Sequence, residues 1–205
     1  AELVAVCDVL HPDQLNLPAD GVSFIKVEQG VPGNEERTAA LESALFYPDL
    51  SSLLAAGLDL DVVSICTPNG LHAGMAIKAI EAGYHVVIEK PLALTVTEAE
   101  RVVYTALKYR KQVFCVMQNR YSPPSVWIKE LVDSRKLGSL YMVQLNCYWN
   151  RDARYYKSGG WHGTADLDGG TLFTQFSHFI DIMYWLFGDI TNIQARFQDF
   201  NHKEV

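Results

Sequence analysis

Three apolar runs of strand length, separated by stretches with helical periodicity, constrain the fold of this chain more than any other feature. The runs occupy residues 61–67 (DVVSICT), 85–90 (HVVIEK) and 112–119 (QVFCVMQN). Their nearly continuous apolar character is typical of strands in a parallel sheet that is covered on both faces. Helical stretches of about 10 to 15 residues between such strands supply the crossovers that parallel pairing requires. The sequence therefore predicts a doubly wound α/β domain.

Helical segments are expected from about Glu35 and around residues 50–56. The later helical stretches carry their own start and stop signals. Residues 73–83 repeat apolar side chains at helical spacing and end at a glycine. Thr95 and Glu98 form a capping-box signature at the start of a second helix, predicted to run to about Tyr109. The side chains expected to face the core from this second helix are Val96, Ala99, Val103 and Leu107.

The pattern changes after Asn119. A helix is predicted over residues 125–136, and residues 140–150 (LYMVQLNCYWN) and 190–200 (ITNIQARFQDF) then alternate apolar and polar side chains. Such alternation is typical of strands with one exposed face in an antiparallel sheet. We therefore expect a first domain over residues 1–119. A second α+β domain, built on a mainly antiparallel open sheet that looks unfinished at Val205, is expected over residues 120–205.

Composition excludes several classes of function. The chain is 49% hydrophobic and 20% charged, and its formal net charge of -7 gives no support to a nucleic-acid partner. No apolar run approaches the roughly 18 residues that would suggest a membrane span. The four cysteines share no C-x-x-C spacing, so reduced thiols in a cytoplasm are expected. His178 and Asp181 would give a metal ion two ligands without a third at plausible spacing, so no metal is expected.

Asp8 ends a further apolar run, residues 3–9 (LVAVCDV), near the start of the chain. An acidic residue at such a strand end can accept hydrogen bonds from the ribose hydroxyls of NAD, and it would repel the 2′-phosphate of NADP. Taken alone, Asp8 can equally be a turn residue. The glycine-rich fingerprint that accompanies this role would lie roughly 20 residues earlier. We therefore expect the first domain to begin before Ala1.

Two further strand ends carry polar side chains where ligands bind in open α/β sheets. In TPNGLHA, Asn69 can cap the following helix, although an ordinary strand-to-helix turn explains the segment equally well. In EKP, Pro91 restricts Lys90 to an extended conformation and can fix a cis bond, which would hold the ammonium in one direction. The alternative is a solvated lysine paired with Glu89.

A helix predicted over residues 171–187 offers a partner for Lys90. Thr174, His178 and Asp181 lie on one stripe of it. His178 can be a proton acceptor, but a histidine on a mostly apolar helix can also be a core residue that Asp181 orients. The apolar stripe expected to be buried comprises Leu172, Phe176, Phe179, Ile180 and Met183.

These segments together resemble one family. A strand-end Asp, TPNGLHA followed by AIEAGYHVVIEKPLA, then QNRYSP, and finally DGG and HFID in this order are similar to the glucose–fructose oxidoreductase/inositol dehydrogenase (Gfo/Idh/MocA) family. The segment RYYKSGGWHGTADLDGG looks most like members that oxidise UDP-N-acetylglucosaminuronate-type nucleotide sugars at the 3-position. The resemblance covers nearly the whole chain and implies a Rossmann-like domain that binds NAD, in preference to NADP.

The resemblance also implies roles for individual residues. Lys90 and His178 are expected to act on one substrate hydroxyl, as charge stabiliser and as proton acceptor. The residues expected to contact the cofactor are Asp8, Thr67, Pro68, Asn69, His72, Glu89, Lys90, Gln118 and Trp161. The residues expected to contact the substrate are Lys90, Arg120, Tyr156, Lys157, Trp161, Thr174, Gln175 and His178.

One position departs from the family pattern, and other functions stay open. Many members carry an Asp where this chain has Thr174, which puts a strict Lys–Asp–His mechanism in doubt. The expected function is hydride transfer between a sugar or nucleotide sugar and NAD by a homodimer or homotetramer that pairs through the second domain's sheet. Alternatives are an NAD-dependent glycosidase of the same fold, which would not accumulate NADH, or a non-catalytic cofactor-binding protein.

Overall fold

The computed structural model describes residues 2–9, 43–152, 154–156, 160–196 and 198. The chain divides into two compact units, Ala1–Asp61 and Val62–Val205. The helix expected from about residue 35 lies outside the described residues. The division expected at residue 119 stays a prediction.

The first unit contains a short parallel pair of strands. β1 (Ala5–Cys7) pairs with β2 (Leu45–Tyr47) in parallel, with Val6 opposite Phe46. β2 was not predicted, because three residues are too few to show a period. α2 (Leu50–Ala55) follows and confirms the helix expected near residue 50. The Asp49 carboxylate caps it by accepting a hydrogen bond of 2.9 Å from the Ser52 amide.

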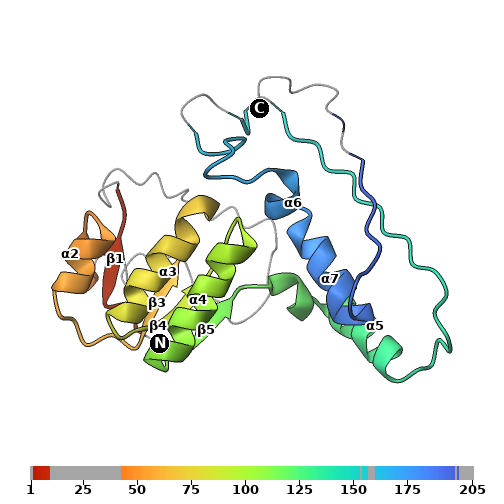
Figure 1. Ribbon diagram of the computed structural model, residues 1–205, viewed down its shortest axis with the longest axis horizontal. Helices are drawn as coiled ribbons and strands as arrows, with labels where there is room; N and C mark the ends of the chain where they lie inside the picture. Colours follow the sequence, from red (N-terminus) through yellow and green to blue (C-terminus); the bar gives the residue numbers. More distant parts are fainter. Residues whose placement is uncertain (1, 10–42, 153, 157–159, 197, 199–205) are drawn as a thin grey trace. The chain divides into compact units, whose positions relative to one another are not determined.

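The second unit contains the three strands that the apolar runs predict. β3 (Val62–Ile65), β4 (His85–Ile88) and β5 (Val113–Cys115) form one parallel sheet in the order β3-β4-β5. The crossovers are α3 (His72–Glu81) and α4 (Val96–Tyr109), labelled in Figure 1, and the two helices pack against each other. The α/β class with a parallel sheet is therefore confirmed.

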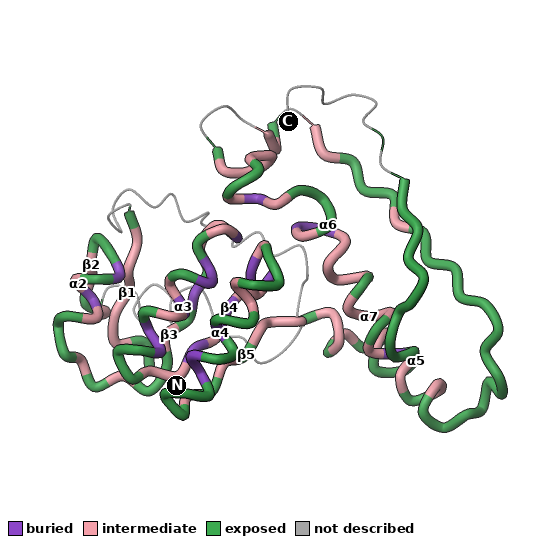
Figure 2. Tube along the Cα trace, viewed as in Figure 1, coloured by how far each residue is buried: buried purple, intermediate pink, exposed green. Residues whose placement is uncertain are grey.

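The core of this unit is formed by buried residues of β3, β4, α3 and α4, and buried residues are drawn purple in Figure 2. Ile65, Val86 and Ile88 of the strands are almost fully buried in one cluster with side chains of α3 and α4. Alternate strand positions project the other way, and Phe114 among them is 57% exposed. The helical part of the core combines Ile80 and Val102 with small side chains: Ala73, Ala76, Ala79 and Ala106.

The face of α4 that packs inward differs from the predicted face. The capping interaction is present, since the Glu98 amide donates to the Thr95 hydroxyl over 3.2 Å. However, Val96 is 76% exposed and Leu107 is 74% exposed, whereas Val102 and Ala106 are buried. The expected inward stripe was therefore wrong at Val96, Val103 and Leu107, whereas Ala99 packs against the core as expected. The observed stripe presents smaller side chains to the alanines of α3, which allows close helix packing.

The remaining elements of the second unit lie after β3 or after β5 along the chain. They are the short turns η2 (Asn69–Leu71) and η3 (Gln118–Tyr121) at the ends of β3 and β5, and the helices α5 (Pro123–Asp133), α6 (Thr171–Thr174) and α7 (Ser177–Phe187). α5 packs against α7, and α7 also contacts η3. α6 and α7 replace the single helix expected over residues 171–187.

The two alternating segments are not strands in the structure. Residues 139–152 have no regular secondary structure. The described residues of the second segment, 190–196 and 198, have none either. Tyr141 and Tyr148 are each 94% exposed, so the segment 139–152 buries little of its surface. Alternation indicates only that a segment can form a strand, and a strand also needs a hydrogen-bonded neighbour. The antiparallel sheet expected in the second part is therefore not formed by the described residues.

Candidate active site

A cavity of about 170 Å³ lies where the chain leaves β4 and meets the helices α6 and α7. Lys90, two residues beyond β4, lines it together with His178 from the first turn of α7. The two residues expected to share one substrate oxygen therefore line one space. The other lining residues are Trp149, Arg151, Tyr155, Trp161, His162, Thr174 and Gln175.

Lys90 is held by the backbone around it. The peptide bond from Lys90 to Pro91 is cis. The Lys90 ammonium donates a hydrogen bond of 2.6 Å to the carbonyl oxygen of Thr174, at the end of α6. Glu89 accepts from the Lys90 backbone amide over 3.2 Å. Partial burial lowers the pKa of the Lys90 ammonium, while the negative charges of Glu89 and Asp168 act in the opposite direction.

His178 has one ring nitrogen without a hydrogen-bond partner. Its Nδ1 atom is buried and has none among the described residues. Burial lowers the pKa of the imidazole below its ordinary value, and the positive charge of Lys90 lowers it further. Both effects favour the neutral ring, which can accept a proton from a hydroxyl group.

Two polar residues where α6 meets α7 are more buried than two apolar residues of these helices. Thr174 and Gln175 are 8% and 7% exposed, whereas Leu172 and Ile180 are 42% and 48% exposed. The predicted apolar face was therefore wrong at Leu172 and Ile180. The helix is interrupted because the Phe176 amide donates to the Thr171 carbonyl over 2.9 Å, five residues earlier, which widens the turn.

Thr174 and Gln175 form a polar floor for the cavity. The Thr174 hydroxyl contacts the Gly170 carbonyl at 3.1 Å and is hydrogen-bonded to the Gln175 side chain. The Gln175 amide nitrogen donates to the Tyr155 hydroxyl over 3.2 Å. Both residues line the cavity. Their contact with a substrate stays a prediction.

One wall of the cavity is a ladder of planar side chains. The Arg151 guanidinium lies 4.4 Å from the centroid of the nearest Trp149 ring and 4.5 Å from that of Tyr155. Tyr155 stacks on His162 at 4.1 Å between centroids, and His162 contacts the Trp161 ring at 3.9 Å. We call these five side chains the aromatic ladder. Trp161 is the one member that the sequence analysis named.

His162 shares two properties with His178. Its Nδ1 atom is buried and has no hydrogen-bond partner among the described residues. Burial is the main cause that lowers the pKa of His162, with Asp168 acting in the opposite direction and Arg151 and Lys90 adding to the lowering. The cavity thus has two imidazoles that favour the neutral form.

Arg120 is not among the residues that line this cavity. It lies in η3, and its guanidinium makes a two-pronged ion pair with Asp181 of α7, in which Nε donates to Oδ2 over 2.7 Å and Nη2 donates to Oδ1. Arg120 was expected to contact the substrate, whereas in the structure its guanidinium pairs with Asp181. Asp181 therefore pairs with Arg120 and not with the His178 ring, which it was considered able to orient.

Asn69 and His72 have structural partners. The Asn69 side chain is 4% exposed and donates to the Asp168 carbonyl over 2.8 Å, and no side chain caps α3. The expected helix cap was therefore wrong. The His72 ring is fully buried, with Nδ1 2.7 Å from the Pro91 carbonyl oxygen and Nε2 2.8 Å from that of Thr67. This burial leaves the imidazole no room to contact a cofactor.

The other predicted cofactor residues lie at the carboxyl ends of the strands. Thr67, Pro68 and Glu89 are half-buried, and Gln118 is exposed in η3. The Thr67 hydroxyl donates to the Met75 sulfur over 3.4 Å. Asp8 follows β1 in the other unit, and its amide donates to the Tyr47 carbonyl over 3.2 Å.

One further predicted substrate residue, Tyr156, is not among the described residues that line the cavity. Tyr156 is half-buried, and its ring meets that of Tyr155 edge-on at 5.0 Å between centroids. Lys157 lies outside the described residues.

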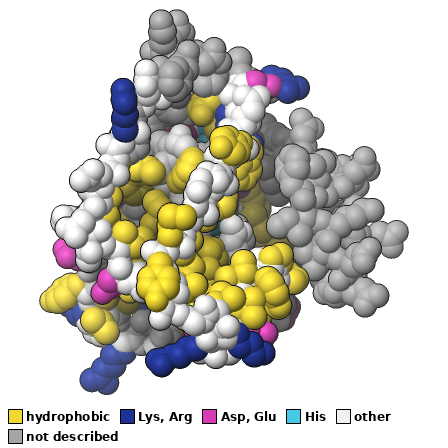
Figure 3. All heavy atoms as spheres, turned by 90° about the vertical axis from the view of Figure 1, so that its right-hand side faces the viewer, with side chains coloured by type: hydrophobic (Ala, Val, Ile, Leu, Met, Phe, Trp, Pro, Cys, Tyr) yellow, Lys and Arg dark blue, Asp and Glu magenta, His cyan; other side chains and the backbone are white. Residues whose placement is uncertain are grey.

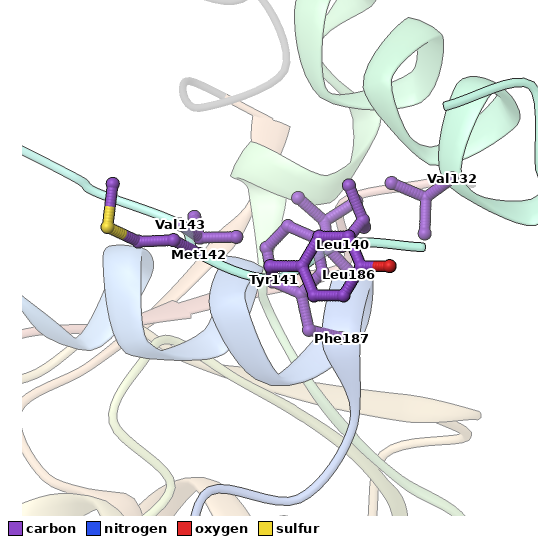
Figure 4. Close-up of a pocket in the computed structure, with 7 residues that line it drawn as sticks. All are labelled: Val132, Leu140, Tyr141, Met142, Val143, Leu186 and Phe187. Carbon is purple, nitrogen blue, oxygen red and sulfur yellow. The ribbon is translucent and has the colours of Figure 1, made fainter. Parts of the chain in front are cut away.

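A second hollow has no chemistry-bearing groups apart from one tyrosine hydroxyl. It is a groove between α5, the end of α7 and the segment after α5, drawn in Figure 4. Its lining residues are Val132, Leu140, Tyr141, Met142, Val143, Leu186 and Phe187. Figure 3 shows how many hydrophobic side chains gather on this side of the molecule. The groove does not compete with the Lys90 cavity as a catalytic site.

Two kinds of feature are absent from the part of the chain that the structure describes. No described helix combines the length and apolar character that a membrane span requires. Within the same residues, no group of three His, Cys, Asp or Glu side chains is arranged to hold a metal ion.

Known proteins with similar sequences were found over most of the chain. An uncharacterized oxidoreductase from Synechocystis sp. is 30% identical over 161 residues, which are 78% of this chain and 43% of that protein. Inositol 2-dehydrogenase from Salmonella typhimurium is 29% identical over 184 residues, which are 87% of this chain and 51% of that protein. The chain therefore spans about half the length of the curated relatives it matches.

Solved structures of WlbA dehydrogenases are similar to this chain. The enzyme from Chromobacterium violaceum, in complex with NADH and UDP-GlcNAcA, gives a TM-score of 0.75 at 35% identity over 92% of this chain and 48% of that chain. The enzyme from Bordetella pertussis, with the same two molecules, gives 0.75 at 33% identity over 92% of this chain and 50% of that chain.

Two family descriptions match the sequence directly. The NAD-binding Rossmann fold of an oxidoreductase family matches residues 10–117, and the GFO/IDH/MocA C-terminal domain matches residues 126–205. The resemblance drawn from the sequence motifs is thus confirmed. This chain belongs to the GFO/IDH/MocA oxidoreductase family, whose N-terminal domain is an NAD-binding Rossmann fold.

Proposed function

We propose that the full-length protein transfers hydride between a secondary hydroxyl of a sugar or nucleotide sugar and NAD, with Lys90 and His178 acting on the same oxygen. The observation that carries this proposal is the cavity of about 170 Å³ that both side chains line at the carboxyl end of β4. Ligands of open α/β sheets bind at this edge. The WlbA structures of similar fold contain NADH and UDP-GlcNAcA, which supports both the cofactor and the class of substrate.

His178 is the proposed proton acceptor. Removal of hydride from a carbon that bears a hydroxyl group requires the hydroxyl proton to leave as well. The lowered pKa of His178 keeps its ring neutral and able to take that proton. The proton moves from the substrate oxygen to a ring nitrogen of His178.

Lys90 is the proposed stabiliser of the charge that develops on this oxygen. An ammonium held in a fixed direction lowers the energy of a developing alkoxide without having to reorganise. The hydrogen bond from Lys90 to the Thr174 carbonyl, at 2.6 Å, shows that its side chain reaches across to α6. A substrate oxygen would use another of the three ammonium hydrogens.

The cofactor fits this edge of the sheet. NAD supplies the hydride acceptor when it is bound. Thr67, Pro68 and Glu89 lie at the carboxyl ends of β3 and β4 and are half-buried, so part of each remains accessible beside Lys90. We propose that Asp8 makes the protein bind NAD in preference to NADP, because a carboxylate at the ribose repels the 2′-phosphate of NADP. Comparable affinities of the full-length protein for NAD and NADP would contradict this role.

The cavity favours a substrate with a negative charge. Its lining includes the positively charged side chains of Lys90 and Arg151, and no carboxylate stands among the described lining residues. This positive lining contrasts with a formal net charge of -7 for the whole chain. A guanidinium can bind a carboxylate through two parallel hydrogen bonds. We therefore propose that Arg151 binds an anionic group of the substrate, such as the carboxylate of a sugar acid.

The experiment is a panel of neutral sugars, sugar acids and nucleotide sugars tested with full-length protein and NAD. The absorbance of NADH measures turnover. A dehydrogenase accumulates NADH in proportion to substrate consumed, whereas a glycosidase that uses the cofactor transiently does not. Stoichiometric NADH with a nucleotide sugar supports the proposal, and its absence across the panel contradicts it.

Variants separate the proposed roles. His178→Ala should lower kcat by roughly 10²–10⁴-fold, the usual worth of a positioned base, and leave the affinity for NADH unchanged. Lys90→Ala should lower kcat and also weaken substrate binding. The double variant should lose much less than the product of the two losses, because both groups act on one oxygen. Near-normal turnover of His178→Ala would mean that this histidine is structural.

Arginine variants test the charge of the substrate. Arg151→Ala should raise KM for a sugar acid and change KM for its neutral parent sugar much less. Arg154→Ala is the matched control, because the Arg154 side chain is 86% exposed and pairs with Asp152 outside the cavity lining. Equal effects of Arg151→Ala on both substrates would contradict an anion-binding role.

We also propose a homodimer or homotetramer, a cytoplasmic location and two domains that meet near residue 119. The resemblance to the family supports the assembly. The absence of C-x-x-C pairs supports a reducing compartment. The two family descriptions, which end at residue 117 and begin at residue 126, support the domain division. Light scattering on the full-length protein tests the assembly.

A further inference from the structure

The turn after β3 is bound to the segment that precedes α6. The Asn69 side chain donates to the Asp168 carbonyl over 2.8 Å, and the Gly70 amide donates to the Leu167 carbonyl over 3.0 Å. Asn69 is 4% exposed and Asp168 is 2% exposed, so this contact excludes water. The two hydrogen bonds join distant parts of the chain, since Asn69 and Asp168 are 99 positions apart in the sequence.

Gly70 fits this contact because it has no side chain. A Cβ atom at this position would lie 1.9 Å from the Asp166 carbonyl oxygen and 3.1 Å from the Leu167 Cα atom. Both are backbone atoms, so the segment 166–168 would have to move to admit even a methyl group. The requirement for glycine is steric, since Gly70 has no positive φ.

Asp168 carries the contact onward to the aromatic ladder. Its carboxylate Oδ2 accepts a hydrogen bond of 2.5 Å from the Gly163 amide, and its own amide donates to the Thr164 carbonyl over 3.0 Å. The Thr164 hydroxyl donates to the Trp161 carbonyl over 2.7 Å. A continuous series of hydrogen bonds therefore runs from Asn69 to the turn 161–164, which holds Trp161 and His162 on the cavity wall.

We propose that Asn69 and Gly70 are positioning residues for the substrate cavity, which they set through Asp168 and the turn 161–164. The turn after β3 lies at the edge of the sheet that is predicted to bind the cofactor. Its hydrogen bonds reach the segment that holds the predicted substrate side of the cavity. The Asn69 side-chain amide is taken up by the Asp168 carbonyl, so a change at Asn69 alters the placement of Trp161 and His162 and leaves the other predicted cofactor residues at the strand ends in place. The kinetic part of this inference rests on the proposed function.

The test that is independent of catalysis is hydrogen exchange of the Gly163 amide in the full-length protein. Asn69→Asp keeps the shape of the side chain but removes the donor, so it should speed exchange of this amide about two- to tenfold, the worth of one net hydrogen bond. Gly70→Ala should speed it by at least as much. Gly74→Ala is the matched control, because a Cβ at Gly74 meets nothing within 4 Å.

The kinetic test uses the same variants with the substrate that the panel identifies. Asn69→Asp should lower kcat/KM for this substrate about tenfold, with the dissociation constant of NADH changed by less than about twofold, since a misplaced cavity wall weakens productive substrate binding. A residue that merely stabilised the fold would leave kinetics at low temperature unchanged. Gly74→Ala should match the unsubstituted protein in both measurements.

The outcomes are distinguishable from failure of the proposed function. Unchanged Gly163 exchange in both Asn69→Asp and Gly70→Ala overturns the inference, whatever the activity. A large rise in the NADH dissociation constant of Asn69→Asp with unchanged Gly163 exchange also overturns it, because Asn69 would then be a cofactor ligand. A protein that turns over no sugar but shows the exchange effect retains the positioning role and loses only the proposed reaction.

Discussion

Replacing His72 with leucine measures how strongly this buried ring joins the ends of β3 and β4. The imidazole lies between the carbonyl oxygens of Thr67 and Pro91, 2.8 Å from the first and 2.7 Å from the second. Leucine has a similar volume, so the change removes hydrogen bonds while leaving little cavity. A neutral imidazole donates through one ring nitrogen, so at least one buried carbonyl loses its donor.

The expected cost follows from that count. A buried acceptor left without a donor costs about 1–3 kcal/mol, so His72→Leu should lower the free energy of unfolding by at least this amount. Urea unfolding followed by far-UV circular dichroism measures it. With a slope of about 2 kcal/mol per molar urea, the midpoint should fall by about 0.5–1.5 M.

His85→Leu is the matched control for this experiment. The His85 ring also makes a hydrogen bond, accepting from the Gln112 amide over 2.9 Å, but this bond is exposed. Water can replace it, so the control should lose less than about 0.5 kcal/mol. A loss in His72→Leu no larger than that in His85→Leu would refute the argument that the buried ring joins the two strand ends.

Three further predictions concern charges and thiols around the site. Lys90→Met should move the NMR titration midpoint of His178 to higher pH, because it removes a positive charge that lowers the pKa of this imidazole, and an unmoved midpoint would contradict the coupling. Asp181→Asn breaks a partly exposed ion pair and should cost about 1 kcal/mol in urea unfolding, so a cost near zero would make the pair irrelevant to stability. Burial is the main cause that raises the pKa of the Cys115 thiol to about 11, and Cys66 is exposed. A thiol-specific disulfide reagent at mildly alkaline pH should therefore modify Cys66 before Cys115. A fast phase of modification that survives Cys66→Ser would be inconsistent with this order.

The sheet and the place of Lys90 could be predicted because they depend on short-range pattern. β3 and β4 are continuous apolar runs bounded by turn residues, and this pattern has few alternatives. Pro91 directly after Lys90 then marks where the strand ends. A strand end in a parallel sheet lies at the ligand edge for reasons of topology, so no knowledge of distant contacts was needed.

The interior faces of the helices could not be predicted in the same way. On α4 the sequence offers two apolar stripes, and the choice between them depends on the alanines of α3, which the sequence of α4 does not contain. On α6 and α7 the polar residues Thr174 and Gln175 are buried because the cavity lies beside them. Hydrophobic periodicity assumes that the polar face meets water, and this assumption fails at a functional site.

The aromatic ladder was missed because it is built on a loop. Trp149, Arg151, Tyr155 and His162 have no period that would place them on a common face. Their density was the available signal, since the stretch YWNRDARYY followed by WH combines rings and arginines in a loop between regular elements. Binding residues concentrate on such loops, so a loop of this composition is itself a signal of a binding site.

The position of Lys90 explains how threonine can stand where many family members carry aspartate. The Lys90 ammonium donates to the backbone carbonyl of Thr174, over 2.6 Å, and every residue type supplies that acceptor. The side chain at this position therefore does not decide where the ammonium lies. A carboxylate there would add a charge next to Lys90 and His178, and that charge would raise the pKa of both groups. With threonine, His178 keeps the lowered pKa that burial and Lys90 give it, and the neutral ring remains available as a proton acceptor. The substitution thus changes the electrostatics of the site while leaving the lysine in place.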